Sequence, residues 1–280
     1  DMVNIYSNSL LRQGVKKDNK VMIFLPSGID MVETILACFE IGAIVVPISQ
    51  NFTEKELKVI IQNIDPCLII SNWKNRKLFS NFSISISCIE DLPNSSSGCA
   101  IIQSDYNKNI NDVCAIILTS GTTGIPKSVQ LTYKNFETSC QNWNSFLNFK
   151  QEDQFLCCLP LSHIGGLAVL IRGIIFGFSI NLISTFDALT VKNTINNYPI
   201  TIISLVPTML KRILEIDGSL NSLKLLRYIL LGGGPSPESL LDFCIEEKLF
   251  IIKVYGMTET CSGTFGLKVL DEPHNKLFAG

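Results

Sequence analysis

The sequence has little of several features that mark whole classes of protein. Its 280 residues include two histidines, and none of its ten cysteines belongs to a C-x-x-C pair, so we expect no structural zinc site. Acidic residues number 25 against 23 basic ones, a near-balance that excludes the basic field of a general nucleic-acid-binding protein. No apolar run approaches the roughly 20 residues of a membrane span. The longest, residues 165–183, contains Arg172 and three internal glycines, and we interpret it as a core helix that runs into a strand.

What is present describes a globular chain of enzyme size. Apolar residues make up 46% of the sequence and charged residues 17%, which is enough for a large core, and the length favours about two domains. We expect free thiols rather than disulfides, since a chain with such a core needs no covalent staples, and free thiols fit a reducing compartment. An abundance of Ile, Asn, Lys and Ser indicates an AT-rich coding sequence, so the expected location is the bacterial cytoplasm or the plastid stroma. No signal-peptide pattern follows Asp1, both ends of the sequence look cut, and nothing indicates the oligomeric state.

Short apolar runs alternate with helical patterns along the chain. Expected strands cover residues 20–25, 43–48, 67–71, 113–118, 154–159, 179–183, 200–205, 227–231 and 250–254. Expected helices cover residues 30–41, 54–64, 134–149, 165–176, 189–197 and 237–248, with one more that has Pro207 in its first turn. This alternation predicts an α/β fold of layered, mostly parallel sheets flanked by helices. Residues 72–111 are a connector or a weak sheet edge, and two sub-domains of about 1–111 and 112–280 are expected.

The first loop with chemical content is residues 118–128, L-T-S-G-T-T-G-I-P-K-S. It follows an expected buried strand and precedes an expected helix, where α/β sheets place their ligands. Glycines, hydroxyl groups and Lys127 together suit a phosphate. The spacing fits neither a Walker loop nor a hydrolase nucleophile elbow. A polar turn with a solvated lysine is the alternative.

Two further loops follow expected strands. In residues 255–260, Y-G-M-T-E-T, Tyr255 can stack on a base and Glu259 can hold a Mg²⁺ that accompanies phosphates; the alternative is a loop whose Thr258 or Thr260 caps a helix. In residues 231–237, L-G-G-G-P-S-P, the glycines permit a flat backbone surface against a planar ligand, and a flexible turn is the alternative.

Together, and in this order, these motifs resemble the adenylate-forming acyl- and aryl-CoA ligases, the AMP-binding enzymes. Residues 119–128, 232–235 and 255–260 match the family's motifs, with Ser128 where glycine is commoner, and the resemblance covers the whole chain as the family's large N-terminal domain. Residues 159–167 with Arg172, 203–210 and 230–235 look most like the o-succinylbenzoate–CoA ligases of menaquinone and phylloquinone biosynthesis. Those ligases usually have Phe-His at 162–163 and serine at 165, where this sequence has Ser162-His163 and Gly165.

The resemblance implies that ATP activates a carboxylic acid, with 2-succinylbenzoate the first candidate, as an acyl-adenylate, and that the acyl group then passes to CoA as a thioester. It implies ATP, Mg²⁺ and CoA as the cofactor, metal and co-substrate, and a small carboxylate as the other partner. The implied catalytic residues are Lys127, His163, Thr258 and Glu259, with Glu259 also the metal ligand. The implied nucleotide-binding residues are Thr119, Ser120, Gly121, Thr122, Thr123, Gly124, Lys127, Gly232, Gly233, Gly234, Tyr255 and Thr258. The implied substrate-binding residues are His163, Arg172, Ser204 and Gly232.

Two of these residues have competing explanations. His163 is either a structural histidine or part of a pocket wall at a strand end. Arg172 lies in an otherwise apolar helical pattern, where an unpaired charge is costly. It needs an anionic partner, which is either the second carboxylate of a dicarboxylate substrate or an internal Asp or Glu, unless the residue lies on an exposed helix face.

The family's small C-terminal domain is expected to be missing. Neither its adenylation lysine nor the aspartate that binds ribose appears after Thr260. Two alternatives to the succinylbenzoate ligase therefore stay open, a ligase for another carboxylate and a truncated, non-catalytic nucleotide-binding domain.

Overall fold

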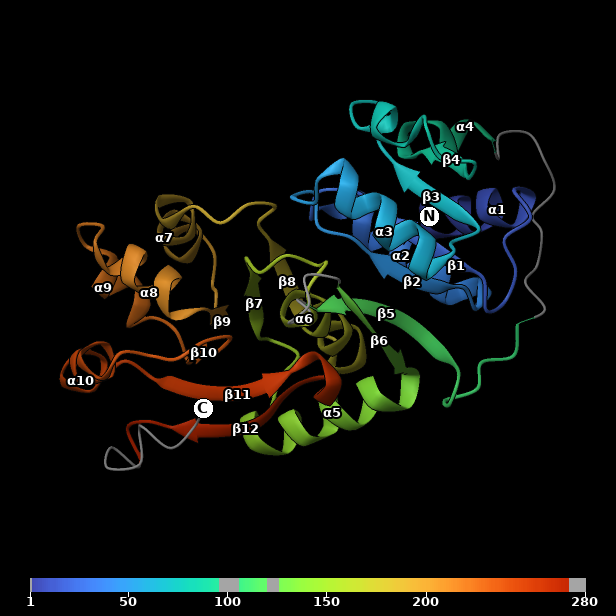
Figure 1. The fold of residues 1–280 in the computed structure, drawn as a ribbon. Coiled ribbons are helices and arrows are strands. Elements are labelled where there is room, and N and C mark those ends of the chain that lie inside the picture. Colours follow the sequence, from blue (N-terminus) through green and yellow to red (C-terminus); the bar gives the residue numbers. More distant parts are fainter. Residues whose placement is uncertain (1, 96–105, 120–125, 272–280) are drawn as a thin grey trace. The chain divides into compact units, whose positions relative to one another are not determined.

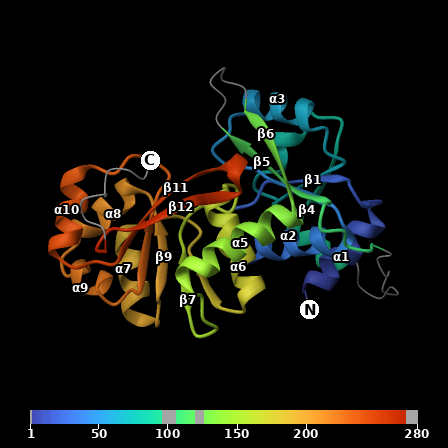
Figure 2. The ribbon, with the colours of Figure 1, turned by 90° about the horizontal axis from the view of Figure 1, so that it is seen from below.

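The computed structural model describes residues 2–95, 106–119 and 126–271, without the side chains of residues 94 and 95. By internal contacts the chain divides into two units, residues 1–135 and 136–280, and each unit holds one six-stranded sheet (Figures 1 and 2). The division falls later than the expected position near residue 111. The reason is that residues 113–119 and 127–132 form two strands that pair in the first sheet and not in the second.

The first unit is a parallel sheet with one antiparallel edge. The strand order is β4-β3-β1-β2-β5-β6, and only the β5–β6 pair is antiparallel. The strands are β1 (Lys20–Ile23), β2 (Ile44–Pro47), β3 (Leu68–Ser71), β4 (Ser85–Cys88), β5 (Val113–Thr119) and β6 (Lys127–Thr132). The helices are α1 (Met2–Arg12), α2 (Ile29–Ile41), α3 (Glu54–Ile64) and α4 (Leu92–Ser95), with the 3₁₀ turns η1 (Arg76–Phe79) and η2 (Ile89–Asp91).

Local sequence signals explain much of this unit. Thr53 and Glu56 form a capping box at the start of α3, in which the Thr53 N–H donates to Glu56 Oε2 at 2.7 Å. β1 and β2 are almost wholly buried because they lie inside a parallel sheet. The weak segment after β3 proves to be a sheet edge, since β4 pairs with β3 in parallel.

The second unit has the strand order β12-β11-β10-β9-β7-β8. All its pairs are parallel except β11–β12. The strands are β7 (Gln154–Cys157), β8 (Ser179–Leu182), β9 (Ile202–Leu205), β10 (Tyr228–Leu231), β11 (Ile251–Met257) and β12 (Ser262–Lys268). The helices are α5 (Tyr133–Leu147), which crosses the division, α6 (Ile164–Phe176), α7 (Ala188–Asn197), α8 (Pro207–Leu214), α9 (Ser219–Leu223) and α10 (Glu238–Glu246), and η3 (Thr258–Thr260) is a 3₁₀ turn.

The helices α7 to α10 pack on one face of the second sheet and not on the other. Alternate residues such as Leu156, Ile203 and Ile229 pack in one buried cluster with apolar side chains of α7, α8, α9 and α10, which lie together in Figures 1 and 2. The opposite face carries Ser204 and Leu230, which are cross-strand neighbours in the register. The period of two along each strand therefore leaves one sheet face free of that cluster.

These observations confirm the predicted α/β fold and correct two details. The phosphate-type loop does not lead into a helix. It joins β5 to the antiparallel strand β6, so it is the loop of a hairpin. The Y-G-M-T-E-T segment likewise leads into the antiparallel strand β12, so neither Thr258 nor Thr260 caps a following helix.

Residues 165–183 form the expected helix and strand, α6 and β8. In the part of the chain that the structure describes, no helix has the length and apolar character needed to cross a membrane.

Candidate functional site

A pocket of about 580 Å³ opens in the second unit where β9, β10 and β11 end. Its walls include Ser204 and Leu230 from the sheet face that the buried helix cluster leaves free, and Val254 two residues beyond Ile252 on that same face. The carboxyl ends of parallel strands are where α/β sheets bind ligands, and the volume lies in the range of small-molecule sites. This pocket is therefore the candidate site of the unit.

The start of α6 forms one wall of the pocket. His163 is the N-cap residue of α6 and lines the pocket together with Gly165. Gly166 allows this turn to pack closely on the chain before it, because a Cβ there would lie 2.4 Å from the Pro160 carbonyl oxygen. Burial lowers the pKa of His163, so its imidazole is neutral at neutral pH and offers one donor and one acceptor.

Arg172, two turns further along α6, brings a positive charge to the pocket. Its side chain is 3% exposed and lines the cavity. The Nη2 group donates to Ser262 Oγ at 3.0 Å, and the guanidinium lies 5.5 Å from the centre of the Trp143 ring. The Nε atom is buried without a hydrogen-bond partner among the described residues.

The surroundings of Arg172 narrow its possible roles. None of the ion pairs within the described residues includes Arg172, and the side chain is buried rather than on an exposed helix face. Burial lowers its pKa, the direction expected for a cation that has left water without a carboxylate beside it. These contacts rule out an exposed helix face for Arg172, and they include no internal Asp or Glu partner among the described residues.

The turn after β11 forms another part of the pocket wall. Thr258 lines the cavity, as do Gly256, Ser262 and Gly263. Cys261 and Ser262 both have left-handed backbones, with φ of 55° and 94°, a conformation that is uncommon for residues other than glycine. Motif reading stopped at Thr260 and missed Ser262, because nothing in the local sequence marks a turn of this kind.

The glycine loop after β10 meets the pocket with two of its three glycines. Gly232 and Gly233 line the cavity, while Gly234 does not. A Cβ on Gly232 would lie 2.8 Å from the Val254 carbonyl oxygen, and Gly233 has φ of +77°, whereas Gly234 has open space around it. Only the first two positions therefore require glycine for the fold.

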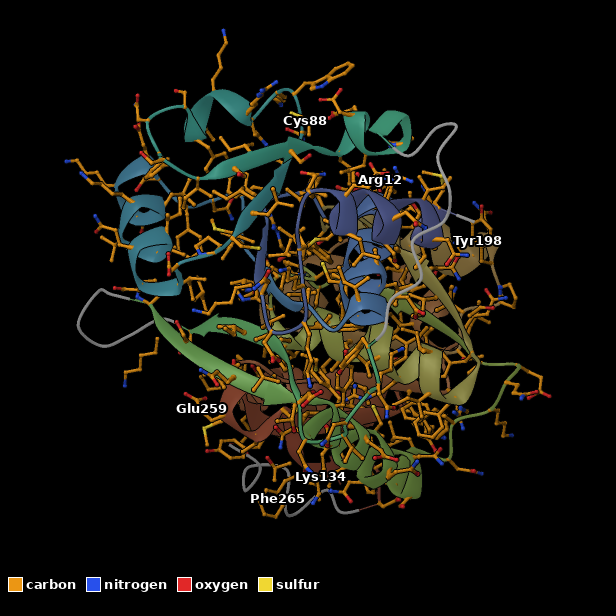
Figure 3. The ribbon with its side chains drawn as sticks, turned by 90° about the vertical axis from the view of Figure 1, so that its right-hand side faces the viewer. Arg12, Cys88, Lys134, Tyr198, Glu259 and Phe265 are labelled. Atoms are coloured by element: carbon orange, nitrogen blue, oxygen red, sulfur yellow. The ribbon has the colours of Figure 1, made fainter. Side chains whose placement is uncertain are left out.

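Tyr255 and Glu259 lie outside the pocket wall. Tyr255 is within β11 rather than in a loop, pairs in register with Phe265 and is 46% exposed. Glu259 is exposed in η3, and the side chains of Glu259 and Phe265 can be found in Figure 3. A base that stacks on Tyr255 would therefore approach from the solvent side of the hairpin.

The predicted magnesium site rests on a single carboxylate. The described residues contain no group of three or more His, Cys, Asp or Glu side chains that could hold a metal ion. Mg²⁺ is commonly held by one or two carboxylates together with phosphate oxygens and water. Glu259, which forms none of the ion pairs among the described residues, fits that mode.

The phosphate-type loop belongs to the first unit. Its ends, Thr119 and Lys127, are direct cross-strand partners in the β5–β6 hairpin, and Lys127 is exposed. The other expected phosphate-binding residues, Ser120, Gly121, Thr122, Thr123 and Gly124, lie outside the described residues.

The parallel sheets and the strand-end pocket are typical of an α/β protein that binds a small molecule. Comparison with known families identifies the family. The AMP-binding enzyme family matches residues 1–278. The chain belongs to this family.

Individual members of the family are similar to this chain in sequence and in structure. The chain is 32% identical over 248 residues to the 2-succinylbenzoate–CoA ligase of Bacillus cytotoxicus, a match that covers 89% of this chain and 50% of the relative. The o-succinylbenzoate CoA synthetase of Bacillus subtilis in complex with the acyl-adenylate OSB-AMP aligns with a TM-score of 0.90 at 29% identity, over 100% of this chain and 57% of that one. The same enzyme with ATP and magnesium ion aligns with a TM-score of 0.90 at 29% identity, over 100% and 58%. This chain thus spans about half the length of the relatives it matches.

Proposed function

We propose that this chain is the acid- and nucleotide-binding part of an AMP-forming acid–CoA ligase that acts on 2-succinylbenzoate, in the biosynthesis of menaquinone or phylloquinone. The observation that carries the proposal is Arg172, a buried cation without a carboxylate partner among the described residues, in the wall of a pocket of about 580 Å³. The names of the similar proteins support the same assignment.

The reaction has two steps. In the first, a carboxylate oxygen of the acid attacks the α-phosphorus of ATP, an acyl-phosphate bond forms, and pyrophosphate leaves. In the second, the CoA thiol attacks the acyl carbon, loses its proton, and AMP leaves with the electron pair of the broken C–O bond. Because both substrates of the first step are anions, the protein must mainly neutralise charge and align the reacting atoms.

The two carboxylates of 2-succinylbenzoate have different partners among the residues that line the pocket. In this proposal Arg172 binds the carboxylate that does not react, through charge-assisted hydrogen bonds. Thr258 and His163, which line the cavity, bind and orient the reacting carboxylate. Ser204 and Gly232 contact the aromatic ring. A mono-acid leaves Arg172 buried without an anion, which costs binding energy.

The proposed position of the nucleotide is beside the glycine loop. In that position the edge of adenine lies along Gly232, Gly233 and Gly234, and Tyr255 stacks on the face of the base. Thr119, Lys127 and the loop between them bind the phosphates. Mg²⁺, held by Glu259 and the phosphates, supplies charge neutralisation when it is bound.

The reducing compartment expected from the sequence stays part of the proposal. All nine described cysteines are free, and eight of them are buried, which is compatible with the cytoplasm of a bacterium or with a plastid stroma. No nucleic-acid partner is proposed.

Exchange of labelled pyrophosphate into ATP tests the proposed activity, because it reports the first step alone. We expect exchange that depends on the acid and is at least tenfold faster with 2-succinylbenzoate than with benzoate. Equal rates with both acids would indicate a ligase for another carboxylate. No exchange with any acid, while ATP still binds, would favour a non-catalytic nucleotide-binding domain.

A further inference from the structure

The guanidinium of Arg172 is fixed by contacts from two other elements. The Ser262 hydroxyl, on the turn that begins β12, accepts a hydrogen bond from Nη2 at 3.0 Å. The Trp143 ring, on α5, lies 5.5 Å from the guanidinium carbon. A ring within cation–π distance and one hydrogen bond restrict the position of the guanidinium group. The Nε edge remains without a partner among the described residues.

Trp143 is itself held in place by the turn that carries Ser262. Its indole Nε1–H donates to the Gly263 carbonyl oxygen at 2.8 Å. Gly263 allows this approach, since a Cβ there would lie 2.4 Å from Trp143 Cζ2. The same tryptophan therefore both anchors the turn and supports the guanidinium.

Helix α5 makes a second attachment to the turn. Ser139, one helical turn before Trp143, donates from Oγ to the Cys261 carbonyl oxygen at 2.8 Å. The two carbonyl groups on either side of Ser262 are thus both bonded to α5, which runs alongside the β11–β12 hairpin in Figures 1 and 2. Thr260 Oγ1 also lies 2.8 Å from the Ser262 carbonyl oxygen.

These attachments maintain an unfavourable backbone. Cys261 and Ser262 have φ of 55° and 94°, and such conformations persist where the surroundings over-determine them, often at ligand sites. A tight turn without a ligand role would more commonly use glycine here, at no steric cost. What Ser262 contributes beyond glycine is its hydroxyl, and that hydroxyl contacts Arg172.

We propose that Ser262, Trp143 and Ser139 are positioning residues that hold Arg172 as a receptor for the second anionic group of a dicarboxylate acid. The inference rests on the proposed acid–CoA ligase function and names the residues that select its substrate class. Ser262 sets the direction of the guanidinium fork, Trp143 restricts its position, and Ser139 keeps Ser262 in place. None of the three takes part in the reaction at the other carboxylate.

The chain provides its own probe, because it has only two tryptophans, Trp73 and Trp143. In a Trp73→Phe background, all indole fluorescence comes from Trp143 beside Arg172. We expect 2-succinylbenzoate and the aliphatic dicarboxylate glutarate to change this fluorescence saturably, and benzoate to change it far less.

Ser262→Gly is the decisive variant, since it removes the hydroxyl and relieves the backbone. We expect it to keep or raise the melting temperature and to weaken binding of both dicarboxylates roughly tenfold, the loss typical of one hydrogen bond to a charged group. Benzoate binding should stay unchanged, and Ser262→Asn, which tolerates a positive φ and keeps a polar acceptor, should restore part of the dicarboxylate affinity. Ser145→Ala is the matched control and should change nothing, because Ser145 is an exposed residue of α5 whose hydroxyl donates to the Gln141 carbonyl oxygen.

The outcomes separate this inference from the proposed function. If Ser262→Gly binds dicarboxylates as the parent does, or loses benzoate equally, Ser262 is only structural and the inference is wrong, even when the parent binds 2-succinylbenzoate. If the parent binds glutarate in a way that needs Arg172 and Ser262 but does not bind 2-succinylbenzoate, the receptor stands and the proposed substrate is wrong. If the parent binds no dicarboxylate, the receptor is overturned.

Discussion

Arg172 Nη2 lies 3.0 Å from Ser262 Oγ, although the two residues are 90 positions apart in the sequence. The contact joins α6 to the turn at the start of β12, and both residues line the strand-end pocket. The one charged side chain of the apolar helix α6 is therefore held in the wall of the pocket.

Removing the charge should affect one substrate selectively. We expect Arg172→Ala to raise the KM for 2-succinylbenzoate at least tenfold and to leave the KM for ATP within about twofold, because the lost charge-assisted bonds concern the acid alone. Steady-state kinetics with each substrate varied in turn measures both constants. Arg212→Ala removes an exposed arginine from α8 and should change neither, while equal rises in both KM values for Arg172→Ala would contradict the assignment.

The lowered pKa of His163 predicts a pH dependence of stability. Burial disfavours the imidazolium form in the folded protein, so the unfolded chain binds this proton more readily than the folded chain. The free energy of unfolding should therefore be insensitive to this residue above its ordinary value of 6.5 and should decrease as the pH falls below that value.

Urea unfolding at a series of pH values measures this slope. His163→Gln, which keeps polar groups but does not titrate, should have a smaller decrease than the parent below pH 6.5. An unchanged slope would show that His163 titrates alike in the folded and unfolded chains. An NMR titration of the imidazole signals in the same two proteins gives the direction of the shift independently.

An ion pair with one buried partner should contribute strongly to the stability of the second unit. Asp153 is 3% exposed in its side chain and lies 2.5 Å from Arg227 Nη2, and it also accepts from Thr201 Oγ1 at 2.8 Å. We expect Asp153→Ala to lower the free energy of unfolding by about 2–3 kcal/mol, because it removes the carboxylate partner of the partly buried Arg227 and one hydrogen bond of the Thr201 hydroxyl. Denaturant unfolding measures the change.

The control for that experiment is an exposed pair at a similar distance. Lys224 and Glu247 lie 2.8 Å apart with side chains 42% and 34% exposed, so Glu247→Ala should cost no more than about 1 kcal/mol. Similar losses for the two variants would mean that the burial of Asp153 carries no special weight.

The glycine loop allows structural and ligand roles to be separated. Gly232→Ala would bring a Cβ to 2.8 Å from the Val254 carbonyl oxygen, and Gly233→Ala would place alanine at φ of +77°, so each should lower stability by about 1–3 kcal/mol. Gly234→Ala has open space and should leave the melting temperature unchanged.

The same Gly234→Ala variant tests the adenine assignment. If adenine lies along this loop, the added methyl group should weaken ATP binding several-fold in a calorimetric titration while the fold stays intact. Unaltered ATP affinity in this variant would argue against a contact between Gly234 and the base.

Parts of the fold that depend on local pattern were predictable, and parts that depend on antiparallel return strands were not. Apolar runs and helical periodicity located β1, α2, α6 and β9 because burial imposes those patterns. β6 was missed because it is a mostly exposed edge strand of polar composition, and β12 because its glycines resemble a loop. α1 was missed since its buried face includes Ser7, Asn8 and Ser9, which hides the apolar period.

Some residues of the candidate site were likewise predictable from the sequence, and others were not. Strand-end reasoning and the family resemblance together singled out His163, Ser204, Gly232 and Thr258, and the structure has all four in the lining of one pocket. Trp143 and Ser262 had no local signal. Their contacts with Arg172 arise only when α5, α6 and the β11–β12 hairpin pack together, and sequence periodicity does not encode pairings over such separations.

We propose above all that this pocket binds a dicarboxylate acid through Arg172. Calorimetric titration with a non-hydrolysable o-succinylbenzoyl-adenylate analogue and with its benzoyl counterpart tests the claim most directly, in the parent chain and in Arg172→Ala. We predict that the parent prefers the succinylbenzoyl compound at least tenfold and that the variant binds both compounds alike. Equal binding of both analogues by the parent, or a preference that survives in Arg172→Ala, would contradict the claim.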